Sequence, residues 1–190
     1  MAHPRFLYVR GTIVDERPLP AWPGFGEPLR GDVAADGSWV AWRMLGRNNH
    51  ELARSVLVYA DVPACTAAAR ALKEQSGLAE LRIGPATDGG RWVWRVYHED
   101  HDVAIASRSY SRQRECHYSL DQFRASLPEA ATGDLRLFDL GQRRLVDPLV
   151  DPPGPVRPVD LPVPPPAGEG RMNLLQPSAM RPPTEAWCPF

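Results

Sequence analysis

The chain has 190 residues, a formal net charge of −1 and 43% hydrophobic residues. This length suits one globular domain with its own core and excludes a pair of ordinary enzyme domains. The near-zero charge argues against a general polyanion binder, which usually carries a basic excess. The three cysteines form no metal motif, redox motif or disulfide framework. The first ten residues have no long apolar run, so we expect a cytoplasmic protein with no membrane segment.

Residues 1–35 combine one strand with a proline-rich connector. Apolar residues predict the strand over 6–14. Residues 18–28 follow with four prolines, Trp22 and Phe25. This composition favours an irregular connector that is packed by its aromatic side chains.

An internal repeat follows, with one unit over residues 36–87 and a second over 88–147. The pair Trp42-Arg43 recurs 52 residues later as Trp94-Arg95. Each unit opens with an alternating strand whose apolar residues share one face: Val40, Trp42 and Met44 in the first, and Trp92, Trp94 and Val96 in the second. A polar turn and a second strand, over 52–57 and 103–107, complete a hairpin in each unit.

Each hairpin is followed by a helix and a short closing strand. Asp61 can cap the first helix and Gly77 ends it. Ser111 can cap the second helix, which Pro128 stops. Closing strands are expected over 78–83 and 135–140. We therefore predict an α+β fold, in which two ββαβ units share an antiparallel sheet with the helices on one face.

Residues 148–190 contain 13 of the 21 prolines and cannot form a helix or a central strand. We expect an extended proline-rich arm. Its last third carries more apolar and aromatic residues than a solvating linker needs, which makes Trp187 and Phe190 candidate binding residues. A flexible, solubilising extension is the alternative interpretation.

Two tandem units of this kind resemble the YegP-like family of unknown function, over about residues 36–140. The resemblance rests on these matching positions: Trp42-Arg43, Asn49, Ala53, Ser55, Tyr59 and Cys65, then Trp94-Arg95, Ala106-Ser107, Tyr110 and Cys116. It implies that the units exchange their closing strands, so that 135–140 pairs within the first unit and 78–83 within the second. The turns depart from the family because they lack Asn-Gly. The resemblance implies no catalytic residues.

Strand alternation also predicts a surface on the side of the sheet away from the helices. Its aromatic and basic side chains would include four candidate binding residues, Trp39, Arg43, Arg95 and Tyr97. The chain's own tail or terminus could cover this face. A protein partner could also bind there, or the face could stack bases and pair phosphates.

Side chains that could support chemistry are few. The run from His98 to Asp102 makes His98 and His101 the candidates for a metal site. We expect a solvated turn instead, because a two-residue turn cannot direct all five side chains inward. Cys65 and Cys116 lie on the apolar faces of the expected helices, where a free cysteine packs as a small hydrophobe. No catalytic motif is present, so we predict no catalytic residue, no metal and no cofactor.

These observations predict a non-enzymatic binding or accessory module. It would contact a protein partner through the proline-rich arm and the open sheet face. One alternative is a nucleic-acid-binding protein that uses Arg43, Arg95 and the aromatic residues beside them. The other is an enzyme whose site has no recognisable motif. The sequence leaves the oligomeric state and the partner open.

Overall fold

The structure is a computed structural model that describes residues 3–13, 18–22, 25, 28–77, 79–87, 89–98, 101–133, 137–141 and 143–146. All of them belong to one of the two units into which the chain divides, residues 1–159. The expected arm over 148–190, with Trp187 and Phe190, lies outside the described residues.

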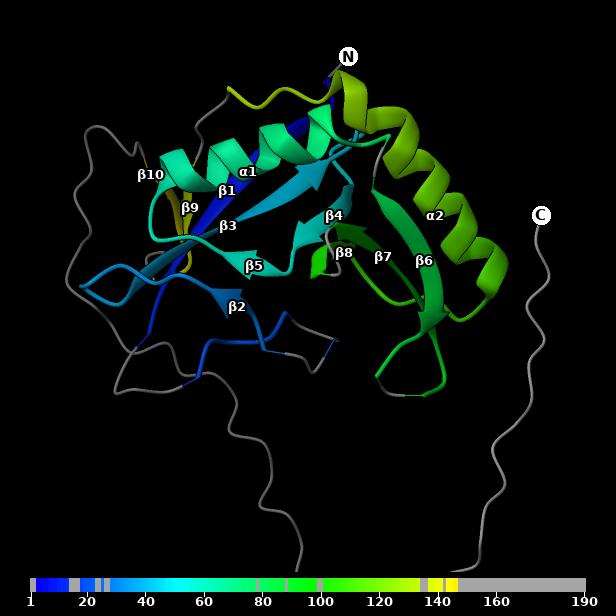
Figure 1. Ribbon diagram of the computed structural model, residues 1–190, viewed down its shortest axis with the longest axis horizontal. Helices are drawn as coiled ribbons and strands as arrows, with labels where there is room; N and C mark the ends of the chain where they lie inside the picture. Colours follow the sequence, from blue (N-terminus) through cyan, green and yellow to red (C-terminus); the bar gives the residue numbers. More distant parts are fainter. Residues whose placement is uncertain are drawn as a thin grey trace, which may run out of the picture. The chain divides into compact units, whose positions relative to one another are not determined.

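Eight strands of the described residues form one sheet (Figure 1). They are β1 (Arg5–Thr12), β3 (Ser38–Leu45), β4 (Glu51–Ser55), β6 (Glu80–Pro85), β7 (Trp92–His98), β8 (His101–Ala106), β9 (Leu137–Asp139) and β10 (Arg144–Val146). Their order across the sheet is β10-β9-β1-β3-β4-β8-β7-β6. Neighbours are antiparallel except β1 and β9, which are parallel. The expected α+β class is confirmed, but the sheet is mixed rather than wholly antiparallel.

Helices α1 (Val62–Glu74) and α2 (Gln113–Ser126) lie on the same face of this sheet (Figure 1). Helix α1 packs on β1 and β3, and α2 packs on β7 and β4. Two tryptophans fill the space beneath them: Trp42 meets the ring of Phe6 edge-on at 5.2 Å, and Trp94 packs on Phe123 at 4.8 Å. Within the described ranges, neither helix is long and apolar enough to cross a membrane.

The two helices begin differently. Asp61 caps α1 as expected, because its Oδ1 accepts a hydrogen bond from the Ala64 N–H at 2.7 Å. The expectation that Ser111 caps α2 is wrong. Arg112 occupies the capping position and its side chain makes no capping hydrogen bond. Glu115 in the first turn instead places a negative charge near the positive end of the helix dipole.

One of the two expected closing strands pairs as the resemblance implied, and the other does not. Strand β6 follows α1 but pairs with β7 of the second hairpin. Strand β9 follows the one-turn helix η1 (Leu127–Glu129) that ends α2, and it pairs with β1 beside the first hairpin. The expected pairing of 135–140 within the first unit, residues 36–87, is therefore wrong, because β1 from residues 1–35 occupies the edge of the first hairpin.

The face of the sheet away from the helices is covered as well. The connector contributes β2 (Arg30–Gly31), which pairs in parallel with β5 (Leu57–Val58). Leu29 and Val58 pack with Trp39 and Ala41 in a second apolar cluster. Trp39 is only 2% exposed, so the expectation that it lies on an open face is wrong. The physical reason is that β3 is apolar on both sides, and the connector folds back to bury the second side.

Trp39 also explains a glycine in the neighbouring strand. Gly11 is the direct partner of Trp39 across β1 and β3. A Cβ atom at Gly11 would lie 2.2 Å from Cζ2 of the Trp39 indole. The ring therefore lies against the main chain of β1, where only glycine leaves room for it.

We expect Gly11→Ala to lower the free energy of unfolding by about 1–3 kcal/mol, because the added methyl group must displace a buried indole. Gly84→Ala is the matched control in β6, since a Cβ atom there meets nothing within 4 Å. Urea unfolding of the two variants and the parent measures the difference. Equal stability of both variants would contradict the packing described for Trp39.

Candidate functional site

Each of the two arginines expected on the open face lies beside a carboxylate that a β-bulge positions. The register of β3 and β4 shifts between Met44 and Leu45, so Leu52 is the extra residue. Glu51 is thereby turned to the face of Arg43 and Arg54, and it forms ion pairs with both. A bulge re-aims side chains in this way because one additional residue reverses the alternation beyond it.

The second hairpin repeats this arrangement. Its register shifts between Val96 and Tyr97, which makes Val103 the extra residue. Asp102 then lies on the face of Arg95 and pairs with it at 2.9 Å. Both side chains are largely buried, at 14% and 13% exposed.

Four arginines cross this face in one line, from β3 through β4 and β7 to β6. Cross-strand pairing sets Arg43 opposite Arg54, and Arg82 opposite Arg95, with Ile105 between Arg54 and Arg95. Three carboxylates pair with the four guanidinium groups, namely Glu51, Asp102 and Glu80. The face is therefore an alternating charge network, and its arginine charges are largely compensated.

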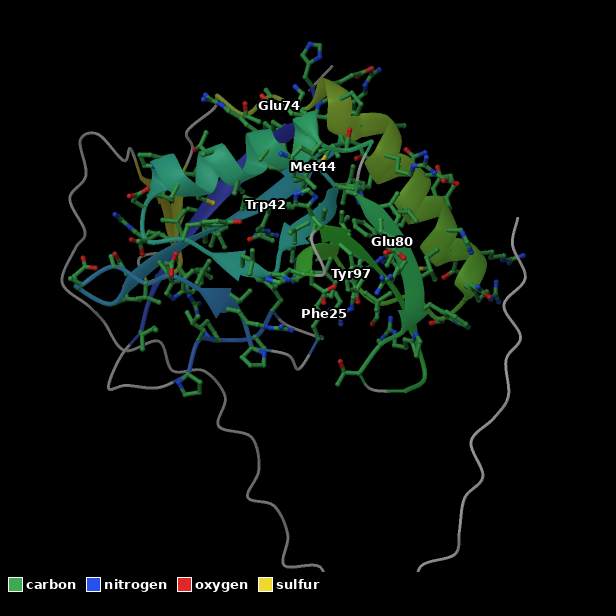
Figure 2. The ribbon with its side chains drawn as sticks, viewed as in Figure 1. Phe25, Trp42, Met44, Glu74, Glu80 and Tyr97 are labelled. Atoms are coloured by element: carbon green, nitrogen blue, oxygen red, sulfur yellow. The ribbon has the colours of Figure 1, made fainter. Side chains whose placement is uncertain are left out.

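The connector covers the middle of this arginine line. Trp22 lies against the Arg54 guanidinium at 5.1 Å, and its Nε1–H donates a hydrogen bond to the Ser55 carbonyl at 2.7 Å. Phe25, which is labelled in Figure 2, lines a cavity on this side of the sheet together with Arg95 and Asp102. The space left beside Arg95 and Asp102 is a cavity of about 20 Å³. That volume is far too small for an organic ligand.

At β6, this face carries an exposed ion pair. The Arg82 guanidinium stacks on the ring of Tyr97 at 4.1 Å and pairs with both carboxylate oxygens of Glu80 at 2.6 Å. Burial and the nearby Asp102 raise the pKa of Tyr97. The four site residues expected on this face therefore do not form one accessible site. Trp39 is buried, Arg43 and Arg95 are ion-paired, and Tyr97 lies half-buried under Arg82.

The two histidines considered for a metal site face each other across the end of the β7–β8 hairpin. His98 and His101 are its last paired residues, and His101 is exposed. Residues 99 and 100 lie outside the described residues. Among the residues that the structure describes, no group of three His, Cys, Asp or Glu side chains could hold a metal ion.

The two helical cysteines are buried, as expected. Cys65 and Cys116 are fully inaccessible in α1 and α2 and form no disulfide. Burial raises the pKa of the Cys65 thiol far above its usual range and that of Cys116 to about 11. Neither group can serve as an activated nucleophile, which needs a lowered pKa and access to substrate.

A larger hollow of about 920 Å³ lies between the β3–β4 turn, the segment before α2 and α2 itself. We call it the α2 groove. Its polar and aromatic lining includes Arg47, His50, Arg108, Arg114, Tyr118 and Gln122. Two carboxylates also line it, namely Glu51, which is paired with Arg43 and Arg54, and Glu115. Its floor is held in place by Ser119, whose Oγ accepts hydrogen bonds from the Tyr110 hydroxyl at 2.5 Å and the Trp94 indole N–H at 3.2 Å. The floor is therefore a preformed surface.

Tyr118 and two arginines give the α2 groove its chemistry. Tyr118 is 68% exposed, which is unusual for so large an aromatic side chain. Arg47 pairs with Glu129, and Glu115 lies 3.9 Å from Arg112. Arg108 and Arg114 form no ion pair within the described part of the chain, although Arg108 stacks on Tyr110 at 5.2 Å. The groove thus combines uncompensated positive charge with an accessible aromatic ring.

Sequence reasoning missed the α2 groove. Its residues come from three separate segments, so no local motif joins them. The one available signal was Tyr118, an aromatic residue two positions after Cys116 and off the apolar stripe of the helix.

We expect Glu51→Ala to lower the free energy of unfolding by about 3 kcal/mol, because it leaves Arg43 and Arg54 without their shared carboxylate in a largely buried position. Glu129→Ala removes the partner of Arg47 at an exposed site, and we expect no measurable change. Chemical denaturation measures both variants. Equal losses of stability in the two variants would show that the ion pairs of Glu51 contribute no more to stability than the exposed pair of Glu129 and Arg47.

We also expect Cys65 and Cys116 to resist iodoacetamide at pH 8 in the folded protein. The raised pKa leaves the Cys116 thiolate more than about 100-fold less populated than in a free cysteine, and burial blocks access to both groups. Peptide mapping by mass spectrometry, with denatured protein as the control, measures the modification. Rapid alkylation of either residue in the folded chain is the contrary result.

A comparison with known proteins found a solved structure that is similar to this chain. The chain is similar to the solution NMR structure of a protein of unknown function, yegP from E. coli, with 11% identity and a TM-score of 0.41. The likeness covers 74% of this chain and 95% of that one. No protein-family model and no curated protein matches the sequence. The YegP-like resemblance expected from the repeated motifs is thus found again by structure, and it concerns a segment of the chain.

Proposed function

We propose that this chain is a non-enzymatic binding module that contacts another protein. The α2 groove is the observation that supports the proposal. It is an open, preformed hollow of about 920 Å³ with Tyr118 on its wall. Tyrosine and arginine are enriched in protein interfaces, because they combine a large contact area with directed hydrogen bonds.

The charges of the α2 groove favour an extended, acidic segment as its occupant. Arg108 and Arg114 have no ion pair in the described residues, so a carboxylate from a partner would meet uncompensated charge. Arginine can hold a carboxylate through two parallel hydrogen bonds. Tyr118 would pack on an apolar side chain of the same segment.

We keep the proline-rich arm as a second proposed contact. Residues 148–190 carry Trp187 and Phe190 near their end, and an aromatic residue on an extended arm can reach a pocket of a partner. The sheet face that the sequence predicts to be open contributes less to partner binding, because the connector already occupies much of it. A cytosolic location goes with this proposal and is supported by the two free, buried thiols.

On the sheet face, we favour the nucleic-acid alternative less than a protein partner. It relied on Arg43 and Arg95, and both guanidinium groups are paired with carboxylates on the same face. Phosphate binding depends on unpaired cations that displace counterions. The enzyme alternative would need a reactive group in the α2 groove, where the hydroxyl of Ser119 is already held by Tyr110 and Trp94.

We further propose that residues 36–87 and 88–147 are a true tandem repeat. Four equivalent features support this. The extra residues of the two bulges, Leu52 and Val103, lie 51 residues apart. Each bulge positions a carboxylate beside an arginine. The bridge of Val40 with Tyr59 has its counterpart in that of Trp92 with Tyr110. Both helices bury a cysteine.

The test is fluorescence anisotropy with a labelled acidic peptide of about ten residues that carries one central aromatic residue. We expect the full chain to bind it. The double variant Arg108→Glu/Arg114→Glu should weaken binding more than tenfold, as reversal of two contact charges does. Tyr118→Ala should also weaken it, while Arg124→Glu, an exposed site of α2 outside the groove, should not.

Two parallel measurements separate the alternatives. A labelled single-stranded oligonucleotide that binds more tightly than the peptide, with affinity falling steeply in salt, would favour nucleic acid. Trp187→Ala/Phe190→Ala in the full chain tests the arm, because loss of captured protein from nuclease-treated host lysate is then expected. Equal peptide binding by all the groove variants would overturn the role of the α2 groove.

A further inference from the structure

Strand β6 ends the sheet on the side opposite β10 (Figure 1). Its inner neighbour is β7, and no other described strand pairs with it. An edge strand presents a row of main-chain N–H and C=O groups that can pair with a further strand. Two properties of β6 decide which strand could pair with it: which main-chain groups point outward, and which side chains lie beside them.

The hydrogen bonds at one end of β6 fix its pattern. Trp92 exchanges both of its main-chain hydrogen bonds with Tyr110, at 2.7 and 2.8 Å. Its partner in β6, Pro85, is therefore in a non-hydrogen-bonded pair, while the next residue, Ala86, donates to the Arg91 carbonyl at 2.7 Å. Because such pairs alternate along an antiparallel ladder, the main-chain groups of Leu81 and Ile83 point away from β7.

The side chains beside these groups carry opposite charges. Glu80 and Arg82 share one face of β6 and are 60% and 51% exposed. Charged residues on an edge normally prevent indiscriminate strand pairing, because most added strands would place like charges or unpaired charges opposite them. They permit pairing where the added strand presents the reverse order of charge.

We propose that β6 pairs with β6 of a second copy of this chain, antiparallel, with Leu81 opposite Leu81 of the copy. In this register Glu80 of each copy lies opposite Arg82 of the other. The outward groups of Leu81 meet each other across the two-fold axis, and Ile83 lies opposite Ala79 of the copy, the residue before β6. Each Arg82 is then flanked by two carboxylates, its own Glu80 and that of the second copy. The proposal is independent of the α2 groove and of its ligand.

The other antiparallel registers of β6 on itself are less favourable. Moving the copy by two residues sets Arg82 opposite Arg82, and like charges directly opposite each other destabilise a strand pair. Moving it by four residues brings Pro85 opposite Leu81, and proline has no N–H to donate to the ladder. The proposed register keeps Pro85 outside the paired segment and matches both charge pairs.

Sedimentation equilibrium of the full chain at up to about 1 mM covers the weak affinities expected of a small interface. We expect a monomer–dimer equilibrium that reaches twice the chain mass of 21.1 kDa. Arg82→Glu alone and Glu80→Arg alone should each abolish the dimer, because each places like charges opposite one another. The double exchange Glu80→Arg/Arg82→Glu reverses both charges and should restore the dimer.

A mixing experiment tests the register directly. The two single variants, each monomeric alone, should associate with each other when mixed, because one carries two arginines and the other two glutamates at the paired positions. Arg112→Glu, an exposed charge reversal at the start of α2, is the control and should leave the dimer unchanged. A chain that stays monomeric throughout this range, or a dimer that tolerates both single reversals, would overturn the proposal.

Discussion

The structure depends on one constraint: strand β3 is apolar on both sides. Trp42 points to one face of the sheet and Trp39 to the other, and both are almost fully buried. A strand of this kind cannot have a solvated face, because exposing either indole would forfeit a large area of apolar burial. Helix α1 covers Trp42, and the connector with β2 and β5 covers Trp39. Gly11 follows from the same constraint, since the Trp39 ring rests on its main chain.

Covering the second face creates an electrostatic problem that the bulges solve. The connector lies over a line of arginines, and charged groups that lose contact with water need partners of opposite sign. Each bulge supplies one. The extra residue in β4 turns Glu51 toward Arg43 and Arg54, and the extra residue in β8 turns Asp102 toward Arg95. The irregularities of the two hairpins are thus the condition under which the connector can pack.

This arrangement determines where the described part of the molecule can meet another one. In the middle of the sheet face, the described residues leave a cavity of about 20 Å³ beside Arg95 and Asp102. The accessible surfaces of interest are the α2 groove, with Tyr118 and two arginines free of ion pairs, and the edge of β6 with its reciprocal charges. The first suits an extended acidic segment of a partner and the second a copy of the chain. Since the two surfaces involve different residues, one chain could use both.

The sequence by itself determined the elements that local physics controls. Alternation predicted β3 and β7, Asp61 predicted the start of α1, and the order of strands and helices predicted the α+β class. The pairing of β6 with the second hairpin was implied by the YegP-like resemblance. Only the tertiary structure decided which faces are open. Trp39 reads as a surface residue because alternation tells which side of a strand a residue is on, but not what covers that side. The bulges at Leu52 and Val103, the parallel pairing of β9 and the α2 groove depend on contacts between segments far apart in the chain, and no local pattern encodes them.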